Sequence, residues 1–303
     1  MQPQPSADRA GTASPAARAW AGERDRLVGI AYRMLGDYGA AEDVASEVAL
    51  DALAAERAGS AIRSWPAWLT TTCVRRSIDR LRHVQSLRED YPGPWLPEPV
   101  ATSRLPDDVV AGRELLSIAM LHLAEQLGPD ARAAIVLHRA FGMTAVEIAP
   151  ILDRTPAAVR QLVSRAERRL HLTDAGAGPR PSSASVAVAI RELVDGIESG
   201  DVDRVARLLT DDAVLWSDGG GIVKSAVNPI FGPARILRFF GGIMAKSALD
   251  GESPRIAVIE VNGESALSMT VSGVTDVIAV EFAGDRIRGI RRISNPRKLT
   301  RVP

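Results

Sequence analysis

The apolar positions divide the 303-residue chain into two helical blocks and a third block that changes from helices to strands. Residues 19–88 and 113–172 repeat their apolar positions with the period of amphipathic helices. Residues 182–303 open with two helices that break at Gly200, and they continue as short β-branched runs separated by Asn-Gly, Ser-Gly and Gly-Asp turns. The pattern predicts a multidomain protein with two all-α modules and an α+β cone built on an antiparallel meander.

Two joints separate these blocks. Residues 89–112 contain YPGPWLPEPV, whose prolines exclude regular helix and favour extended polyproline II, although its Trp and Leu need a dry surface. The second joint, residues 173–183, has the sequence TDAGAGPRPSS and predicts a domain boundary. Residues 1–18 have no apolar segment, and we expect them to be disordered.

Residues 143–170, MTAVEIAPILDRTPAAVRQLVSRAERRL, carry the clearest chemical pattern. A short helix ends at Leu152, a tight turn follows, and Thr155 is placed to cap a second helix. One side of that second helix is apolar, and the other offers guanidinium and amide donors of the kind that read duplex DNA. An ordinary amphipathic helix with a solvated face is the alternative. The candidate DNA-binding residues are Thr155, Arg160, Gln161, Ser164, Arg165 and Arg168.

A predicted helix within residues 27–53 carries an acidic surface, formed by Glu42, Asp43, Glu47 and Asp51. Three of these carboxylates follow one another at i, i+4 and i+8, a spacing that destabilises a helix by about 0.2–0.5 kcal/mol per pair. Helix stability therefore does not explain them. They suit a basic partner surface, and a merely solvated face is the alternative.

Residues 63–84 form a helix that combines tryptophan with arginine. Aromatic rings can stack on unpaired bases while arginines follow the phosphates of a single strand. Tryptophans in such a helix are also common anchors of a core. The candidate residues for single-strand contacts are Trp65, Trp68, Arg75, Arg76, Arg80 and Arg82.

Composition narrows the classes of function. The chain has 37 basic and 37 acidic residues, so any contact with nucleic acid has to come from local patches. The single cysteine, Cys73, excludes a disulfide framework and agrees with a reducing compartment. No apolar run is long enough to span a bilayer. We expect a cytoplasmic protein without membrane contact, metal or cofactor.

Three segments in order, ERDRLVGIAYRMLGDYGAAEDVASEVAL, WPAWLTTTCVRRSIDRLR and VRQLVSRAERRL, resemble regions two and four of an extracytoplasmic-function (ECF) RNA polymerase sigma factor. GPWLPEPV resembles the linker of the SigJ-like group, which carries a fused SnoaL-like, NTF2-like C-terminal domain. SDGGGIVKS and SNPRKL resemble two further signatures of that group. Two positions depart from them: Ile222 stands where the group has lysine, and Arg297 replaces an acid.

This resemblance implies a role for each surface. The acidic surface would bind core RNA polymerase, the Trp/Arg helix would hold the melted −10 promoter element, and the helix at 155–170 would read the −35 element. The linker would extend because regions two and four sit far apart on polymerase. We expect the C-terminal domain to dock on the linker and govern both regions, through Trp95, Leu96, Pro97, Glu98, Asp218, Gly219, Gly220, Gly221, Asn295, Pro296 and Lys298.

Two other classes of function stay open. A one-component helix-turn-helix regulator with a small-molecule-sensing NTF2-like domain would bind DNA without replacing a sigma subunit, but it would not need the acidic surface. An enzyme would need a base to assist Asp218, and no histidine follows His171, so we expect no catalysis. A small-molecule ligand of the concave sheet is a further partner that the sequence leaves open.

Overall fold

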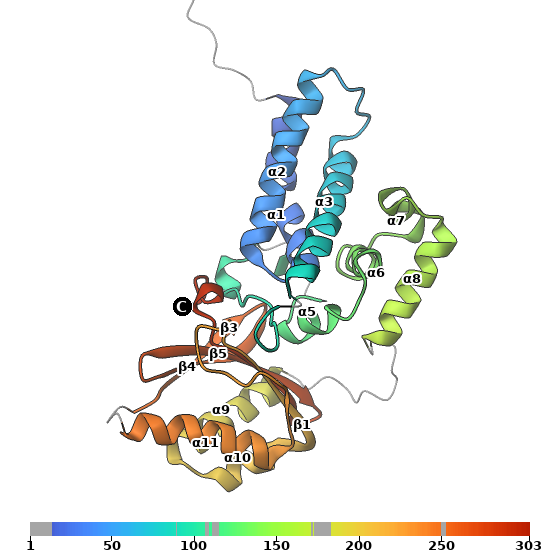
Figure 1. Ribbon diagram of the computed structural model, residues 1–303. Coiled ribbons are helices and arrows are strands. Elements are labelled where there is room, and N and C mark those ends of the chain that lie inside the picture. The colour runs from blue at the N-terminus through green and yellow to red at the C-terminus, as the bar shows by residue number, and fades with distance from the viewer. Residues whose placement is uncertain are drawn as a thin grey trace, which may run out of the picture.

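The chain folds into two helical modules and an α+β domain, seen in a computed structural model that describes residues 14–88, 90–106, 109–110, 115–170, 172, 183–249 and 253–303. Parts of the first joint and nearly all of the second, residues 173–182, lie outside the described residues. Three long helices stand at one end, a helix-turn-helix lies beside them, and a sheet with three helices forms the other end (Figure 1). None of the helices in the described part of the chain is long and apolar enough to cross a bilayer.

The first module consists of α1 (Pro15–Leu35), α2 (Tyr38–Arg57) and α3 (Trp65–Arg88). Helix α1 begins earlier than expected, because the Ser14 side chain accepts a hydrogen bond from the Ala17 amide and caps the helix. The expected disordered start at 1–18 is therefore wrong for residues 14–18, and residues 1–13 lie outside the described residues. Gly36, at φ 67°, ends α1 and lets α2 fold back along it.

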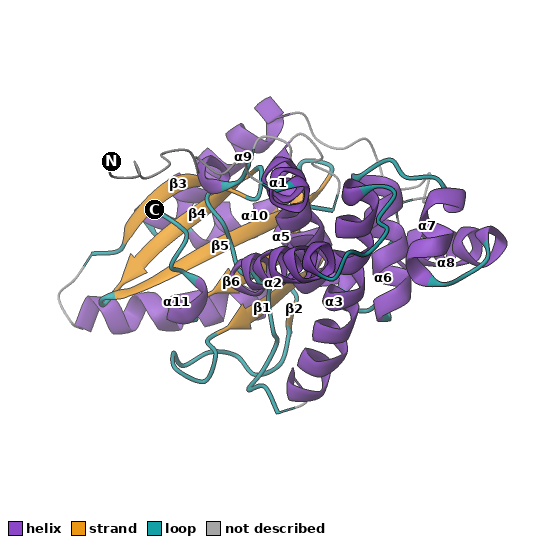
Figure 2. Cartoon of the chain, turned by 90° about the horizontal axis from the view of Figure 1, so that it is seen from above, coloured by secondary structure: helices purple, strands orange, loops and turns teal. Residues whose placement is uncertain are grey.

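The second module holds the helix-turn-helix where the sequence placed it. Its helices are α5 (Ile118–Ala124), α6 (Pro129–Ile135), the π-helical turn η2 (Val136–Ala140), α7 (Ala145–Leu152) and α8 (Pro156–Arg169). Thr144 and Thr155 cap α7 and α8, and Asp153 adopts φ 53° in the tight turn between them. Seen from above, α7 and α8 lie on the side of the molecule away from the sheet (Figure 2).

The two helical modules share one hydrophobic core. Ile78 of α3, Ile135 of α6 and Ile148 of α7 belong to the same buried cluster, and α3 packs on both α6 and α7. The expected separation of the modules by a rigid linker is therefore not found in the free chain. The apolar faces of the two modules are buried against each other instead.

Linker residues 90–93 form a bend, residues 94–100 run beside this core without helix or strand, and a short 3₁₀ turn follows, η1 (Thr102–Arg104). The α+β domain follows the second joint. Its elements are α9 (Ser183–Ser199), α10 (Val202–Leu208), β1 (Leu209–Asp218), β2 (Ile230–Phe231), α11 (Pro233–Leu249), β3 (Arg255–Val261), β4 (Glu264–Val271), β5 (Val274–Ala283), β6 (Arg286–Ile293) and the 3₁₀ turn η3 (Pro296–Lys298).

The six-stranded sheet has the order β2-β1-β6-β5-β4-β3. Strands β3 to β6 form the expected antiparallel meander, whereas β1 pairs parallel to β6, so the sheet is mixed. The expectation of a wholly antiparallel sheet is corrected there. After β1 the chain forms a long loop, the short strand β2 and then α11. This connection brings β3 to the edge of the sheet opposite β2.

Each face of the sheet has its own cover. Helices α9, α10 and α11 lie under one face, where Ile190 and Ile236 pack on Leu215 and Ile290 (Figure 1). The other face carries the linker and α5, so the sheet lies between its own helices and the helical modules. The fold class predicted from the sequence, two helical modules followed by an α+β domain, is confirmed.

Candidate nucleic-acid interface and interdomain contacts

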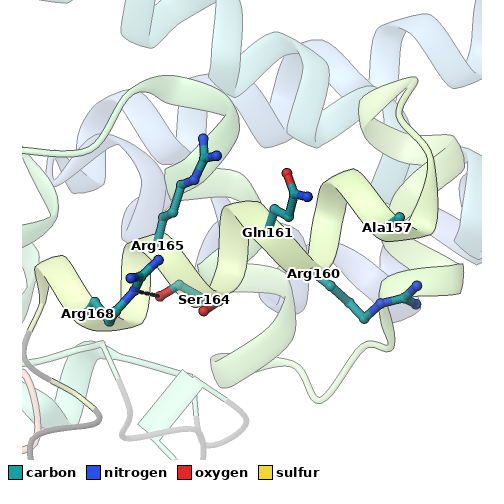
Figure 3. A pocket seen from close by; sticks show the side chains of 6 residues that line it. All are labelled: Ala157, Arg160, Gln161, Ser164, Arg165 and Arg168. Atoms are coloured by element: carbon teal, nitrogen blue, oxygen red, sulfur yellow. Dashed lines mark hydrogen bonds between the residues drawn. The ribbon is translucent and has the colours of Figure 1, made fainter.

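The polar face of α8 is open to solvent. Arg160, Gln161, Ser164, Arg165 and Arg168 are all exposed and, with Ala157, line a shallow hollow of about 530 Å³ (Figure 3). The opposite side of the helix is buried in the core. Guanidinium and amide groups spaced along one exposed helix face can donate to base edges and phosphates in a major groove.

Thr155 has a different role from the other candidates on α8. Its hydroxyl oxygen accepts a hydrogen bond from the Ala158 amide at 3.2 Å and so caps the helix. Its position at the helix start still faces solvent. The structure thus uses Thr155 to fix the N-terminus of α8, on which the five candidate polar side chains are carried.

Trp65 and Trp68 lie together at the start of α3. Their ring centroids are 5.8 Å apart with an interplanar angle of 72°, the edge-to-face arrangement that aromatic pairs favour. Both rings are partly buried against the shared core. Each ring thus packs on the core and keeps part of its surface exposed, so the role as core anchor is present and contact with unpaired bases stays a prediction.

The four candidate arginines of α3 divide between two faces of the helix. Arg76 binds both carboxylate oxygens of Asp51, with Nε–Oδ2 2.6 Å and Nη2–Oδ1 2.8 Å, and its Nη1 binds Glu47 at 2.6 Å. Arg80 lies 3.7 Å from Asp43. These two arginines therefore face α2 and its acidic surface.

The acidic surface accordingly has a basic partner within the chain. Besides the arginines of α3, Arg301 from the C-terminal tail binds Glu42 at 2.8 Å. The sequence analysis looked for basic partners within the same helix. The partners instead come from α3 and from the C-terminal tail. The side chains of Glu42, Asp43, Glu47 and Asp51 keep between 34% and 67% of their surface exposed, so an external partner can still reach them.

Arg75 and Arg82 face the second module. Arg75 Nε donates to the Ile151 carbonyl at 3.4 Å, and Arg82 lies 3.5 Å from Asp130. Asp130 also binds Arg154 of the helix-turn-helix turn at 2.8 Å. All four candidate arginines of α3 thus contact protein atoms in this conformation.

The linker lies on the sheet of the α+β domain. Leu96 is fully buried and packs with Ile118 of α5 and Ile293 of β6. The Trp95 ring lies between Gly36 of the first module and the Lys298 ammonium, whose Nζ is 4.1 Å from the ring centroid. The two apolar side chains of the linker therefore find their dry surface where all three parts of the chain meet.

A buried ion pair fixes the linker to the α+β domain. Asp218, at the end of β1, binds Lys298 Nζ at 2.7 Å and accepts hydrogen bonds from the Leu96 amide at 2.9 Å and the Tyr91 hydroxyl at 2.6 Å. Lys298 also donates to the Leu96 carbonyl at 2.5 Å. We call this set of five residues, Tyr91, Trp95, Leu96, Asp218 and Lys298, the linker contact.

The glycine turn after β1 supports the linker contact. Gly220, at φ 59°, donates its amide to Asp218 at 3.0 Å. A Cβ there would lie 2.2 Å from the Asn295 side chain, so only glycine fits. A Cβ at its neighbours Gly219 and Gly221 would come close to Val223 and Pro92. Pro296, another candidate, is exposed. Ile222 is 52% exposed and Arg297 is exposed, so both departures from the group signatures point away from the buried ion pair.

Glu98 joins the linker to the first module and to the C-terminal tail. Its buried carboxylate accepts from the Tyr38 amide at 2.7 Å, at the N-terminus of α2, and from Arg301 at 2.9 Å. Burial raises the pKa of Glu98 above its ordinary value. Pro97 is buried beside Gly36, which completes the contact of this stretch with the first module.

Asn262 is a contact residue that the sequence did not reveal. Its Oδ1 accepts from the Val100 amide at 3.0 Å, and its Nδ2 donates to the Tyr32 hydroxyl at 2.6 Å and the Leu116 carbonyl at 2.9 Å. The Asn-Gly pair predicts a hairpin turn, and Asn262 does adopt φ 55° between β3 and β4. The sequence around Asn262 does not indicate that its side chain is buried where the linker, α1 and the second module meet.

His122 and Arg291 form a second contact that the sequence did not reveal, where α5 meets the sheet. The His122 and Trp216 rings pack edge to face at 5.4 Å, and the Arg291 guanidinium lies 4.8 Å from the Trp216 centroid. Glu281 binds Arg291 at 2.8 Å. Burial and the charge of Arg291 lower the pKa of His122 to about 3, so α5 docks with a neutral imidazole.

Asp218, the candidate acid of the α+β domain, is used in the linker contact. Asp218 faces the linker rather than the interior between sheet and helices, and its oxygens are occupied by four donors. The described residues contain no group of three or more His, Cys, Asp or Glu side chains placed to hold a metal ion.

Comparison with known proteins agrees with the arrangement. Residues 21–86 match the family model of Sigma-70 region 2, and residues 117–170 match that of Sigma-70, region 4. The chain is 33% identical over 294 residues to the ECF RNA polymerase sigma factor SigJ of Mycobacterium tuberculosis, covering 92% of each. It is 30% identical over 198 residues to a probable ECF RNA polymerase sigma factor SigI of the same organism, covering 64% of this chain and 67% of that relative.

Among solved structures, the crystal structure of the M. tuberculosis sigma factor SigJ superposes with a TM-score of 0.72 at 30% identity. The match covers 93% of this chain and 97% of that one. It therefore includes the α+β domain as well as both helical modules.

Proposed function

This chain belongs to the ECF RNA polymerase sigma factors, and we propose that its C-terminal α+β domain holds it in a closed form that has to open before it can span a promoter. As a sigma factor it binds core RNA polymerase, recognises promoter DNA and initiates transcription. The observation that carries the proposal is the linker contact, in which a buried Asp218–Lys298 pair from the α+β domain holds the backbone of Leu96.

The closed form follows from three contacts that share one segment. The linker is bound to the sheet by Leu96, to the first module by Glu98, and to the C-terminal tail by the Ala101 amide, which donates to the Arg301 carbonyl at 2.9 Å. A linker held in this way cannot move away from the core to span two distant sites, so regions two and four stay packed on each other. Release of the α+β domain would free the contacts of Leu96 and Ala101 together and would leave Glu98 bound to the first module alone.

The exposed face of α8 supports a role in reading the −35 element as duplex, and we assign that role to Arg160, Gln161, Ser164, Arg165 and Arg168, with Thr155 as the capping residue. The tryptophans and arginines of α3 are assigned to the −10 element, and the acidic surface to core polymerase. In the closed form Arg75 and Arg82 contact the second module, which supports a state that is not ready for the −10 strand.

The C-terminal domain acts in this proposal as a regulator and not as an enzyme. The space between the sheet and its helices is filled by apolar side chains such as Leu193, Phe239 and Met244. Asp218 is committed to the linker contact. A small molecule that binds the domain would act by shifting the equilibrium between closed and open forms.

Reconstituted transcription on a cognate promoter tests the proposal. Core polymerase with the full chain should give open complexes. A chain that ends at residue 172 should give more open complexes per bound sigma factor, because it lacks the Asp218–Lys298 pair that holds Leu96. The exposed carboxylate variant Asp211→Asn, on the same strand as Asp218, should behave like the full chain. Duplex binding without open complexes would favour the one-component regulator, and equal output from both chains would remove the regulatory role of the domain.

A further inference from the structure

Two arginines of α3, Arg76 and Arg80, form ion pairs with the acidic surface of α2. Arg76 commits Nε, Nη1 and Nη2, all three of its nitrogens, to the carboxylates of Asp51 and Glu47 at 2.6–2.8 Å. Arg80 lies 3.7 Å from Asp43 one turn further along. Two of the arginines assigned to the −10 element are therefore bound in the free protein to three of the carboxylates assigned to polymerase.

Neither partner surface can bind fully while these pairs persist. A DNA phosphate that binds Arg76 competes with Asp51 and Glu47, because three of the five N–H groups of Arg76 are already given to those carboxylates. A cationic surface of polymerase likewise competes with Arg76 for the negative charge of the same carboxylates. Each external partner therefore competes with an internal one, and its arrival sets the other internal group free.

We infer that the ion pairs between Arg76 and the acidic surface couple core polymerase binding to −10 recognition. Binding of polymerase to Glu47 and Asp51 releases Arg76 for a promoter phosphate, and phosphate binding by Arg76 makes the carboxylates available to polymerase. The coupling is reciprocal, since one free energy links the two binding events. This inference rests on the proposed function, because it takes the assigned partners of both surfaces as given.

The ion pairs of Arg76 are exposed enough to solvent that an external partner can replace either side. Arg76, Glu47 and Asp51 are between 34% and 43% exposed, and ion pairs of this kind are weak enough to be replaced by an outside group. The α+β domain offers a contrast in Arg292 and Asp276, which pair through two bonds of 2.7 and 2.9 Å but are almost fully buried. A buried pair of that kind has no path to an external partner.

The helices need not separate for this exchange. Between α2 and α3 the apolar residues Val44, Val48, Val74 and Leu81 are buried in the shared core and hold the two helices together. Only the side chain of Arg76 has to change rotamer. The coupling is therefore independent of the opening of the linker contact and should act in any chain whose first module is folded.

Two binding measurements on the intact chain test the inference. The first uses a fluorescein-labelled single-stranded DNA of mixed sequence, about 15 nucleotides long, within the size of one single-strand site. In the free protein Asp51→Asn should tighten DNA binding about fivefold, a typical coupling factor. Asp25→Asn on α1, the same charge change beside Arg24, should leave DNA affinity within twofold of the unchanged chain. The gain should vanish in Asp51→Asn combined with Arg76→Gln, which shows that it passes through Arg76.

The second measurement is the affinity of the labelled chain for core polymerase. Glu47→Gln and Asp51→Asn should weaken it, whereas Arg76→Gln should tighten it about fivefold, because the carboxylates lose their internal competitor. Arg76→Lys should lie between the unchanged chain and Arg76→Gln. Circular dichroism confirms that each variant is folded.

The outcomes separate failure of the coupling from failure of the assigned function. If the acid variants weaken polymerase binding but Arg76→Gln does not tighten it, the coupling is overturned and the polymerase surface stands. If the acid variants leave polymerase affinity unchanged, the assignment of the acidic surface itself is wrong. An equal gain in DNA affinity from Asp25→Asn would reduce the effect to net charge and would also overturn the inference.

Discussion

Asp218→Asn is the substitution that most directly opens the linker contact. The Asp218 carboxylate is fully buried and receives Lys298 Nζ, the Leu96 amide, the Tyr91 hydroxyl and the Gly220 amide. An asparagine keeps the shape but replaces one acceptor oxygen by an amino group. In either orientation two of these donors then face another donor, and the Lys298 ammonium loses its counter-ion.

The size of the effect follows from the burial of the pair. Removing one partner of a buried ion pair costs about 3–5 kcal/mol, because the remaining charge is left uncompensated. In the open form both groups are hydrated, so this cost falls on the closed form alone. At about 1.4 kcal/mol per factor of ten, the population of the open form should rise by roughly a hundred- to several-thousand-fold.

Hydrogen exchange at the Leu96 amide measures this equilibrium directly, since that N–H is bound to Asp218. Protection of Leu96 should fall by that factor, while the amides of β5 in the interior of the sheet keep theirs. The double variant Asp218→Asn with Lys298→Met should recover at least tenfold of the loss, because no uncompensated charge remains. Asp211→Asn, an exposed carboxylate of the same strand, serves as the control.

Two results would refute this reasoning about the linker contact. If Leu96 keeps its protection in Asp218→Asn, the buried pair does not hold the linker. If β5 loses protection together with Leu96, the substitution unfolds the domain instead of releasing it, and the double variant then decides whether charge burial is the cause.

Two further predictions concern pH and promoter reading. The pKa of His122 is lowered to about 3 while α5 is docked beside Arg291, Glu281 and Lys298. It should return to about 6.5 when α5 leaves the sheet. The docked form is therefore fully favoured above pH 6.5 and loses stability as the pH falls from 6.5 towards 3. Exchange of the Leu96 amide should therefore be about tenfold faster, relative to the intrinsic rate, at pH 5.5 than at pH 7.5, and His122→Gln should abolish the difference. Arg160→Ala should weaken binding to the −35 duplex by about 1–3 kcal/mol if it reads a base, and equal loss on a scrambled duplex would make it a phosphate contact.

The sequence predicted best those features whose causes are local. The helix-turn-helix was placed correctly because Thr155 and Pro156 are a helix start at consecutive positions and the apolar stripe of α8 repeats within the helix. The strands of the meander were found because each is bounded by a turn signal. Helix α11 was missed because Gly241 and Gly242 interrupt its pattern, although its apolar residues pack on the sheet.

The features that were missed depend on residues far apart in the chain. The pairing of Arg76 with Asp51 needs the crossing of α2 and α3, and no spacing within either helix shows it. The junction at Asn262 joins positions separated by as many as 230 residues. The resemblance to a linker signature located the linker contact, but the packing of regions two and four on each other could not be read from any motif.

The interface between the two helical modules contains buried guanidinium groups as well as apolar side chains. Arg33 of α1 is almost fully buried there, donating to the Val109 carbonyl at 2.8 Å, and burial lowers its pKa to about 10. Arg132 of α6, also buried, donates to the Arg33 carbonyl at 3.2 Å and binds Glu125. Guanidinium groups that lose water on closing regain it on opening, so this interface gives up less free energy on separation than an apolar one of equal area. In the proposed closed form, this balance would let the two modules separate once the linker contact is released.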